Sequence, residues 1–171
     1  MVERVPVEAE PVRFGERLAS SQAFLTLFRE GMALVEETAS YLDGDGRQEA
    51  KFLQRQAALT YATESMRLTT RLMQIASWLL LHRAVNEGEM SLAQAAKEKN
   101  KAKVGLSAYR DEEAVRLLPD RLQELIERSV RIQERVQRLD ATIHTAAVDV
   151  APPSPVERQL GMLKAAFGGR G

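Results

Sequence analysis

Hydrophobic residues recur every three or four positions between residues 47 and 87, in a stretch without proline or glycine. This spacing predicts one long helix. Two neighbouring apolar stripes run along residues 59–85, which indicates that the helix packs against two neighbours. One stripe comprises Leu59, Ala62, Met66, Thr69, Met73, Ala76 and Leu80, and the other comprises Tyr61, Ser65, Leu68, Leu72, Ile75 and Leu79.

Few charges accompany these stripes. Between residues 57 and 85 the acidic and basic side chains are Glu64, Arg67, Arg71 and Arg83. A helix with so little polar surface is not stable alone in water, so we expect the chain's own helices and a second copy to cover it. The residues that we assign to this dimer or partner interface are Leu68, Leu72, Ile75, Trp78 and Leu79.

A first helix is predicted before the long one, with Ser20 or Ser21 as its N-cap. Gly31 lies inside it, which favours either a close crossing by another helix or simple tolerance of a glycine. Residues 43–46 read Asp-Gly-Asp-Gly, a short turn that predicts an antiparallel return, with Gly44 left-handed and Asp45 as the next cap. The expected apolar stripe is Leu18, Ser21, Leu25, Phe28, Met32, Val35, Ala39 and Leu42.

A third helix is predicted from Leu118 onward, and Ser91 is expected to cap a short helix that ends near Lys99. The fold class is therefore all-α: an antiparallel three-helix bundle with a long central helix, a short connecting helix and flexible N- and C-terminal tails. We expect a tail over residues 1–15, the bundle over 16–147 and a second tail over 148–171. The seam of the third helix is Leu118, Leu122, Leu125, Ser129, Ile132, Val136, Leu139 and Ile143.

The C-terminal tail begins with the linker sequence Ala-Pro-Pro-Ser-Pro at residues 151–155. Beyond it, apolar residues spaced by four, three and four positions predict a short amphipathic segment that cannot hold a helix alone. Such a segment folds either against a partner's groove or against the bundle of its own chain. These residues are Val156, Leu160, Leu163 and Phe167.

Composition and charge limit the classes of partner that we expect for this chain. The chain of 171 residues has 24 basic and 24 acidic side chains, so it lacks the net positive charge that draws a protein to nucleic acid. The absence of cysteine fits a reducing cytosol, and neither a signal peptide nor an apolar run of about 20 residues for a membrane span is present. We expect a cytoplasmic protein with no nucleic-acid or membrane partner. The lysine-rich residues 97–103 favour a solvated connector over a phosphate-binding patch.

Candidate chemistry is sparse. Asp140 and His144 share a helical face at a spacing of four, which supplies two possible metal ligands without a third, and His82 lies beside the apolar run. No catalytic, cofactor-binding or metal site is predicted, so we expect a helical protein that binds other proteins. The alternatives are a trihelical DNA-binding regulator, with residues 97–103 and the third helix facing DNA, and a metal-dependent helical enzyme.

Two long strings, residues 31–44 and 64–90, resemble RcdA, the regulator of CtrA degradation of alphaproteobacteria. The resemblance covers roughly residues 14–146. It implies a dimeric three-helix bundle that acts as a non-enzymatic adaptor, without cofactors, for the ClpXP protease. The implied partners are ClpX, the response regulator CpdR that primes the protease, the cyclic-di-GMP-binding protein PopA and cargo proteins, with transient placement at the cell pole.

Overall fold

The computed structural model describes residues 21–101, 111–149 and 159. Within this part of the chain, three long helices and three shorter ones follow one another. The expected N-terminal tail and the four residues of the tail motif, Val156, Leu160, Leu163 and Phe167, lie outside it. The helices are α2 (Gln22–Asp43), α3 (Asp45–Ala50), α4 (Arg55–Asn86), α5 (Leu92–Lys101), α6 (Glu112–Val115) and α7 (Asp120–Asp149).

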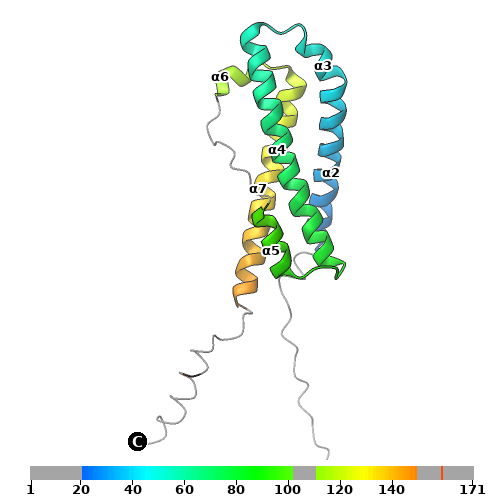
Figure 1. Ribbon diagram of the computed structural model, residues 1–171, viewed down its shortest axis with the longest axis vertical. Helices are drawn as coiled ribbons and strands as arrows, with labels where there is room; N and C mark the ends of the chain where they lie inside the picture. Colours follow the sequence, from blue (N-terminus) through cyan, green and yellow to red (C-terminus); the bar gives the residue numbers. More distant parts are fainter. Residues whose placement is uncertain (1–20, 102–110, 150–158, 160–171) are drawn as a thin grey trace, which may run out of the picture.

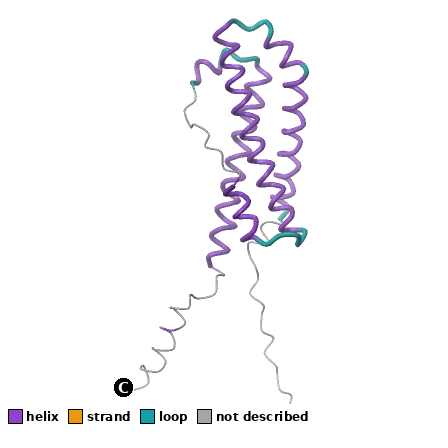
Figure 2. Tube along the Cα trace, viewed as in Figure 1, coloured by secondary structure: helices purple, strands orange, loops and turns teal. Residues whose placement is uncertain are grey.

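Each of the three long helices packs against the other two, so the all-α three-helix bundle is confirmed (Figures 1 and 2). α2 runs antiparallel to both α4 and α7. α4 and α7 run parallel to each other, because the chain between them returns along the bundle before α7 begins (Figure 1). Two hydrogen bonds between these helices show the parallel direction. Arg71 of α4 donates to Ser129 of α7, and farther along both helices Trp78 donates to Asp140.

The buried face of α2 lies one position away from the predicted stripe. Ser21 caps the helix as predicted, its hydroxyl accepting from the Phe24 N–H at 3.4 Å. A Cβ at Gly31 would stand 2.5 Å from the Leu79 side chain, so the close helix crossing is confirmed and selects this register. Leu25 of the predicted stripe is 42% exposed instead. The residues that face the core are Phe24, Leu27, Gly31, Leu34, Thr38 and Tyr41.

The predicted single helix over residues 47–87 is wrong at its start. α3 ends at Ala50, and α4 begins at Arg55 after a turn in which the backbone of Gln54 is extended. The Tyr41 hydroxyl donates to Glu49 at 2.8 Å and holds α3 over the end of α2, so tertiary contacts override helix propensity.

The turn between α2 and α3 also differs from its prediction. Gly44 has a φ of −105° and is not left-handed, and it occupies the cap position that we had assigned to Asp45. The glycine needed for steric reasons is Gly46, where a Cβ would lie 2.7 Å from the ring of Tyr41. Close packing of α3 on the Tyr41 ring therefore explains the second glycine of the turn.

The prediction for α7 is confirmed. Every residue of its predicted seam is buried except Leu139, which is half-buried against the core. The polar member, Ser129, donates to the Ile126 carbonyl at 2.7 Å and accepts from Arg71 at 2.9 Å. The helix begins at Asp120, two residues after the predicted start, and continues to Asp149. The short helix α5 begins after Ser91, whose hydroxyl accepts from the Gln94 N–H as a cap.

Candidate interaction surface

The outer face of α4 carries a row of exposed apolar side chains. Leu59, Met66, Met73 and Leu80 are 65%, 72%, 65% and 49% exposed, and they are spaced by seven residues. The small residues Ala62, Thr69 and Ala76 stand between them on the same face. We call these seven residues the α4 stripe. It is the first of the two stripes predicted from the sequence.

Two helices pair along a seam of apolar and small side chains whose spacing along the sequence is three and four residues in turn. From Leu59 to Leu80 the row would span about 30 Å at 1.5 Å per residue. Scattered surface leucines are normal, but a continuous apolar row of this length is typical of a protein–protein contact. Two formal charges of the helix, Glu64 and Arg71, lie away from it: Glu64 is 5% exposed and Arg71 bonds the buried Ser129.

The residues assigned from sequence to the interface lie elsewhere, which corrects that assignment. They are covered by the protomer's own helices, because Gly31 of α2 and the seam of α7 pack on this side of α4. A second chain would have to unfold the bundle to reach them. Their exposed fractions are 0% for Leu68, 4% for Leu72, 2% for Ile75, 4% for Trp78 and 0% for Leu79.

A polar cluster joins α4, α5 and α7. Asp140 accepts from the Trp78 indole N–H through one carboxylate oxygen and from the Lys99 ammonium through the other, each at 2.8 Å. The ring of His82 stacks on Trp78 with centroids 4.0 Å apart. A groove of about 300 Å³ beside this cluster is lined by Gln74, Ile75, Ser77, Trp78, Leu81, Lys99, Gln133, Val136, Gln137 and Asp140.

Burial and hydrogen bonding set the charges of this cluster. Burial acts to raise the pKa of Asp140, but the hydrogen bonds from Lys99 and Trp78 outweigh it and hold that pKa below its ordinary value. Burial lowers the pKa of His82, so its imidazole is neutral at pH 7, and its Nδ1–H donates to the Trp78 carbonyl. The cluster therefore contains one carboxylate, Asp140, and one ammonium, Lys99, and its net charge is zero.

The Asp140–His144 pair is a contact between neighbouring turns of α7. The His144 Nδ1 lies 2.9 Å from the Asp140 carbonyl and 3.6 Å from its carboxylate, a contact within one helix. Among the described residues, no group of three or more His, Asp or Glu side chains is placed to hold a metal ion. Asp140 instead orients Trp78 and Lys99, a partnership across 62 and 41 residues for which the sequence offers no local signal.

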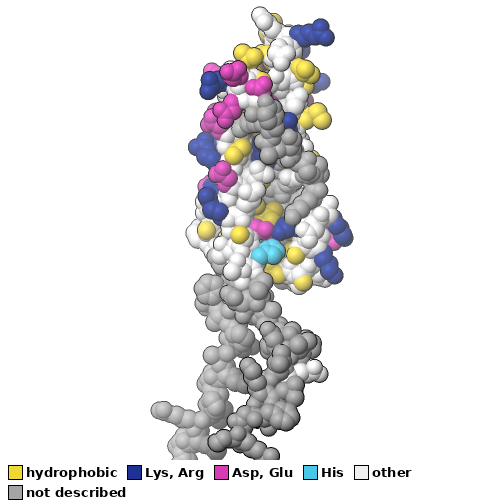
Figure 3. Space-filling model, turned by 90° about the vertical axis from the view of Figure 1, so that its left-hand side faces the viewer, with side chains coloured by type: hydrophobic (Ala, Val, Ile, Leu, Met, Phe, Trp, Pro, Cys, Tyr) yellow, Lys and Arg dark blue, Asp and Glu magenta, His cyan; other side chains and the backbone are white. Residues whose placement is uncertain are grey.

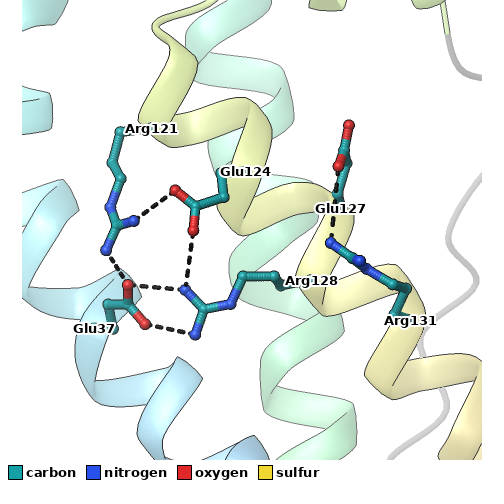
Figure 4. Close-up of polar contacts among 6 residues, drawn as sticks. All are labelled: Glu37, Arg121, Glu124, Glu127, Arg128 and Arg131. Atoms are coloured by element: carbon teal, nitrogen blue, oxygen red, sulfur yellow. Dashed lines mark hydrogen bonds and ion pairs between the residues drawn. The ribbon is translucent and has the colours of Figure 1, made fainter.

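Ion pairs tie α7 to α2 (Figure 4). Arg128 forms a two-pronged contact with Glu37, with distances of 2.7 and 2.8 Å, and Arg121 also contacts Glu37. The Arg128 hydrogen bond holds the pKa of Glu37 below its ordinary value. Arg135 pairs with Glu30 farther along the same helices.

These ion pairs weaken the DNA-binding alternative, since Arg121, Arg128 and Arg135 of α7 are already paired with carboxylates of α2. On the face drawn in Figure 3, acidic and basic side chains alternate along one edge instead of forming a patch of one sign. Of the lysine-rich segment, the described Lys99 and Lys101 pair with Asp140 and Glu98. Binding to phosphates would require these pairs to break.

Comparisons with known proteins agree with the fold. A family model described as "Protein of unknown function (DUF1465)" matches residues 15–167. The crystal structure of RcdA from Caulobacter crescentus CB15 is 52% identical, with a TM-score of 0.62, over 75% of this chain and 96% of that chain. The chain belongs to the RcdA family. No curated protein matches it.

For this RcdA-family chain, the sequence resemblance is thereby confirmed. The match to RcdA covers nearly all of the solved chain and three quarters of this one. In the described part of the chain, no helix has the length and apolar character needed to cross a membrane. The surface of this RcdA-family bundle that stands out is the α4 stripe.

Proposed function

We propose that the chain is a non-enzymatic adaptor that delivers cargo proteins to the ClpXP protease in cell-cycle-regulated proteolysis. The observation that carries this proposal is the α4 stripe, a long apolar face that the described helices leave uncovered. Similarity to RcdA at 52% identity supports the protease pathway in particular. An adaptor needs surfaces that bind other proteins rather than a reactive site. The exposed apolar residues of the α4 stripe provide such a surface.

The adaptor acts by raising the local concentration of cargo at the protease. Two contacts on one molecule make the second binding event intramolecular, which increases capture by orders of magnitude without new chemistry. The partners are ClpX primed by the response regulator CpdR on one side, and cargo or the second adaptor PopA on the other. The site of action is the cytoplasm, with transient placement at the cell pole.

A second copy of the chain is the occupant that fits the α4 stripe. A two-fold dimer apposes the same surface on both copies, so each apolar side chain meets apolar or small side chains of its partner. The small residues Ala62, Thr69 and Ala76 leave room for the larger ones of the other copy. Seven-residue spacing keeps this complementarity in step along the paired helices. The homodimer therefore forms through the outer face of α4.

The C-terminal segment supplies a further contact. The four apolar residues of the tail motif, Val156, Leu160, Leu163 and Phe167, lie outside the described structure, and we retain for them the docking role that their spacing predicts. Ending the chain after Ala151 should leave the bundle folded, because every described helix precedes that point. Delivery of cargo should then be lost. Unchanged cargo degradation by the shortened chain would contradict this role.

Binding to the protease tests the proposal directly. Purified alphaproteobacterial ClpX is passed over the immobilised full chain, with and without CpdR and PopA, and retention is measured at 150 mM salt. We expect ClpX to be retained when CpdR is present, and cargo half-life in a reconstituted ClpXP reaction to shorten when the chain is added. If ClpX, CpdR and PopA all pass unretained in every combination, the adaptor function is refuted.

A further inference from the structure

The short helix α5 is loosely attached to the bundle. Of its ten residues, Ala95 is the one that is buried, at 2% exposure. Three cavities border it: the groove of about 300 Å³ beside Lys99, a second of about 320 Å³ beside Leu92, and a third of about 360 Å³ beside Glu98. α5 lies on α4 and packs Leu92 against the core, but open grooves border it and its other side chains are exposed or half-buried, so little apolar surface holds it in place.

One polar contact compensates for this weak packing. The Lys99 ammonium donates to Asp140 at 2.8 Å, with the two side chains 20% and 23% exposed. Asp140 is in turn fixed by the Trp78 indole N–H. A charge-assisted hydrogen bond that is largely shielded from water is stronger than a surface ion pair. Lys99 therefore connects α5 to α4 and α7 through a single carboxylate.

The connection from α4 to α5 can serve as a hinge. Gly88 has a φ of +76°, and a Cβ placed there would meet nothing within 4 Å. The residues on either side, from Glu87 to Met90, are exposed or half-buried. A short, open, glycine-containing connection can absorb a change of backbone angles without disturbing the core.

We propose that α5 is a latch that detaches from the bundle as a unit while α2, α4 and α7 remain folded, and that the Lys99–Asp140 contact is its catch. Detachment opens the cavity beneath α5, whose walls include His82 and Ile143, and it frees one side of Trp78. The molecule thus holds a second apolar surface that is hidden while the latch is closed. This device is independent of the adaptor function and of the α4 stripe.

Cysteine reactivity measures the detachment, because the natural chain contains no cysteine. Ala95→Cys places a thiol under α5, and Thr38→Cys places one in the core of α2, where the native side chain is 3% exposed. In the full-length chain at neutral pH, we expect the thiol at position 95 to react with a disulfide reagent at least tenfold faster than the thiol at position 38. Its rate should also be insensitive to low urea, because opening of α5 exposes little surface.

A matched pair of lysine variants tests the catch. Lys99→Met removes the ammonium that reaches α7, whereas Lys101→Met removes one that pairs with Glu98 inside α5. We expect Lys99→Met to speed labelling at position 95 by about tenfold, the size expected for a charged hydrogen bond, and to leave labelling at position 38 unchanged. Lys101→Met should change neither rate. Equal effects of the two variants would overturn the role of Lys99.

Hydrogen exchange of the natural chain provides a test without any substitution. Amide protons of α5 should exchange faster than those in the centres of α4 and α7, and low urea should leave their rate unchanged. The latch is overturned if α5 amides, or the thiol at position 95, open only together with the core and with the same urea dependence. In that case α5 would be an integral part of the bundle.

Discussion

Replacing Met66 and Met73 with glutamate should separate the proposed dimer without unfolding the protomer. Both side chains lie on the α4 stripe and are 72% and 65% exposed, so a carboxylate at either position is solvated in the isolated chain. Glutamate is also a good helix former. Between two copies the same carboxylates would be buried in an apolar seam, next to one another and without a basic partner. The substitution therefore acts on association rather than on folding.

The size of the effect follows from the exposed fractions. Fully burying a side chain of this size contributes about 1.5–3 kcal/mol, and scaling that range by the exposed fractions in both copies gives about 4–8 kcal/mol for the two methionines. Each 1.4 kcal/mol is tenfold in affinity, so the dissociation constant should rise at least about a thousandfold. Desolvation of the glutamates adds to this increase.

Sedimentation velocity over a hundredfold range of concentration measures the change, with circular dichroism as the check on folding. Met66→Leu with Met73→Leu is the matched control, because it keeps the stripe apolar, and it should remain a dimer. The reasoning fails if the glutamate variant sediments as the natural chain does. It fails equally if the natural chain is a monomer at every concentration, since the uncovered stripe would then not be a contact between copies.

Three further predictions concern the protomer. Gly31→Ala should lower the free energy of unfolding by about 1–3 kcal/mol in urea, because the added Cβ would lie 2.5 Å from Leu79; an unchanged midpoint would mean that Leu79 moves aside freely. Burial lowers the pKa of His82, so the unfolded chain takes up a proton at this residue at a higher pH than the folded chain does, and the free energy of unfolding should fall as pH drops below about 6.5. His82→Gln should reduce the dependence of the free energy of unfolding on pH. An equal pH dependence in the variant and the natural chain would contradict this prediction. Arg128→Gln should raise the pKa of Glu37 toward its ordinary value, as measured by NMR titration, and a pKa that does not move would show that Arg121 suffices.

The seam of α7 was predictable from the sequence because one face of that helix is apolar and the other is charged. Residues such as Leu122 and Ile132 alternate with arginines and glutamates, whose charged groups are costly to bury. Local periodicity then determines burial, and the only buried polar member, Ser129, satisfies its hydroxyl on the backbone of its own helix and on Arg71. Prediction succeeds where a single orientation is compatible with the pattern.

The register of α2 was not predictable in the same way. Leu25 and Phe24 are neighbours of similar hydrophobicity, and each begins an apolar row with helical spacing. The choice depends on Gly31, because the absence of a Cβ lets Leu79 of α4 approach closely at that position. A hydrophobicity pattern records which side chains avoid water, but not how closely another backbone comes.

The two stripes of α4 present the same ambiguity, and here the charges do not resolve it. The few charged residues do not mark the water-facing side, because Glu64 is buried beside Arg67 and Arg71 reaches across to Ser129 of α7. Glu64 and Arg71 therefore serve contacts inside the protomer, and the α4 stripe from Leu59 to Leu80 carries no charge. A core can accept a charge when a partner residue satisfies it, whereas an apolar row facing water gains nothing until another surface covers it. The inference that one copy cannot cover this helix therefore applies to the row from Leu59 to Leu80, and the residues first assigned to the interface are the ones that hold the protomer together.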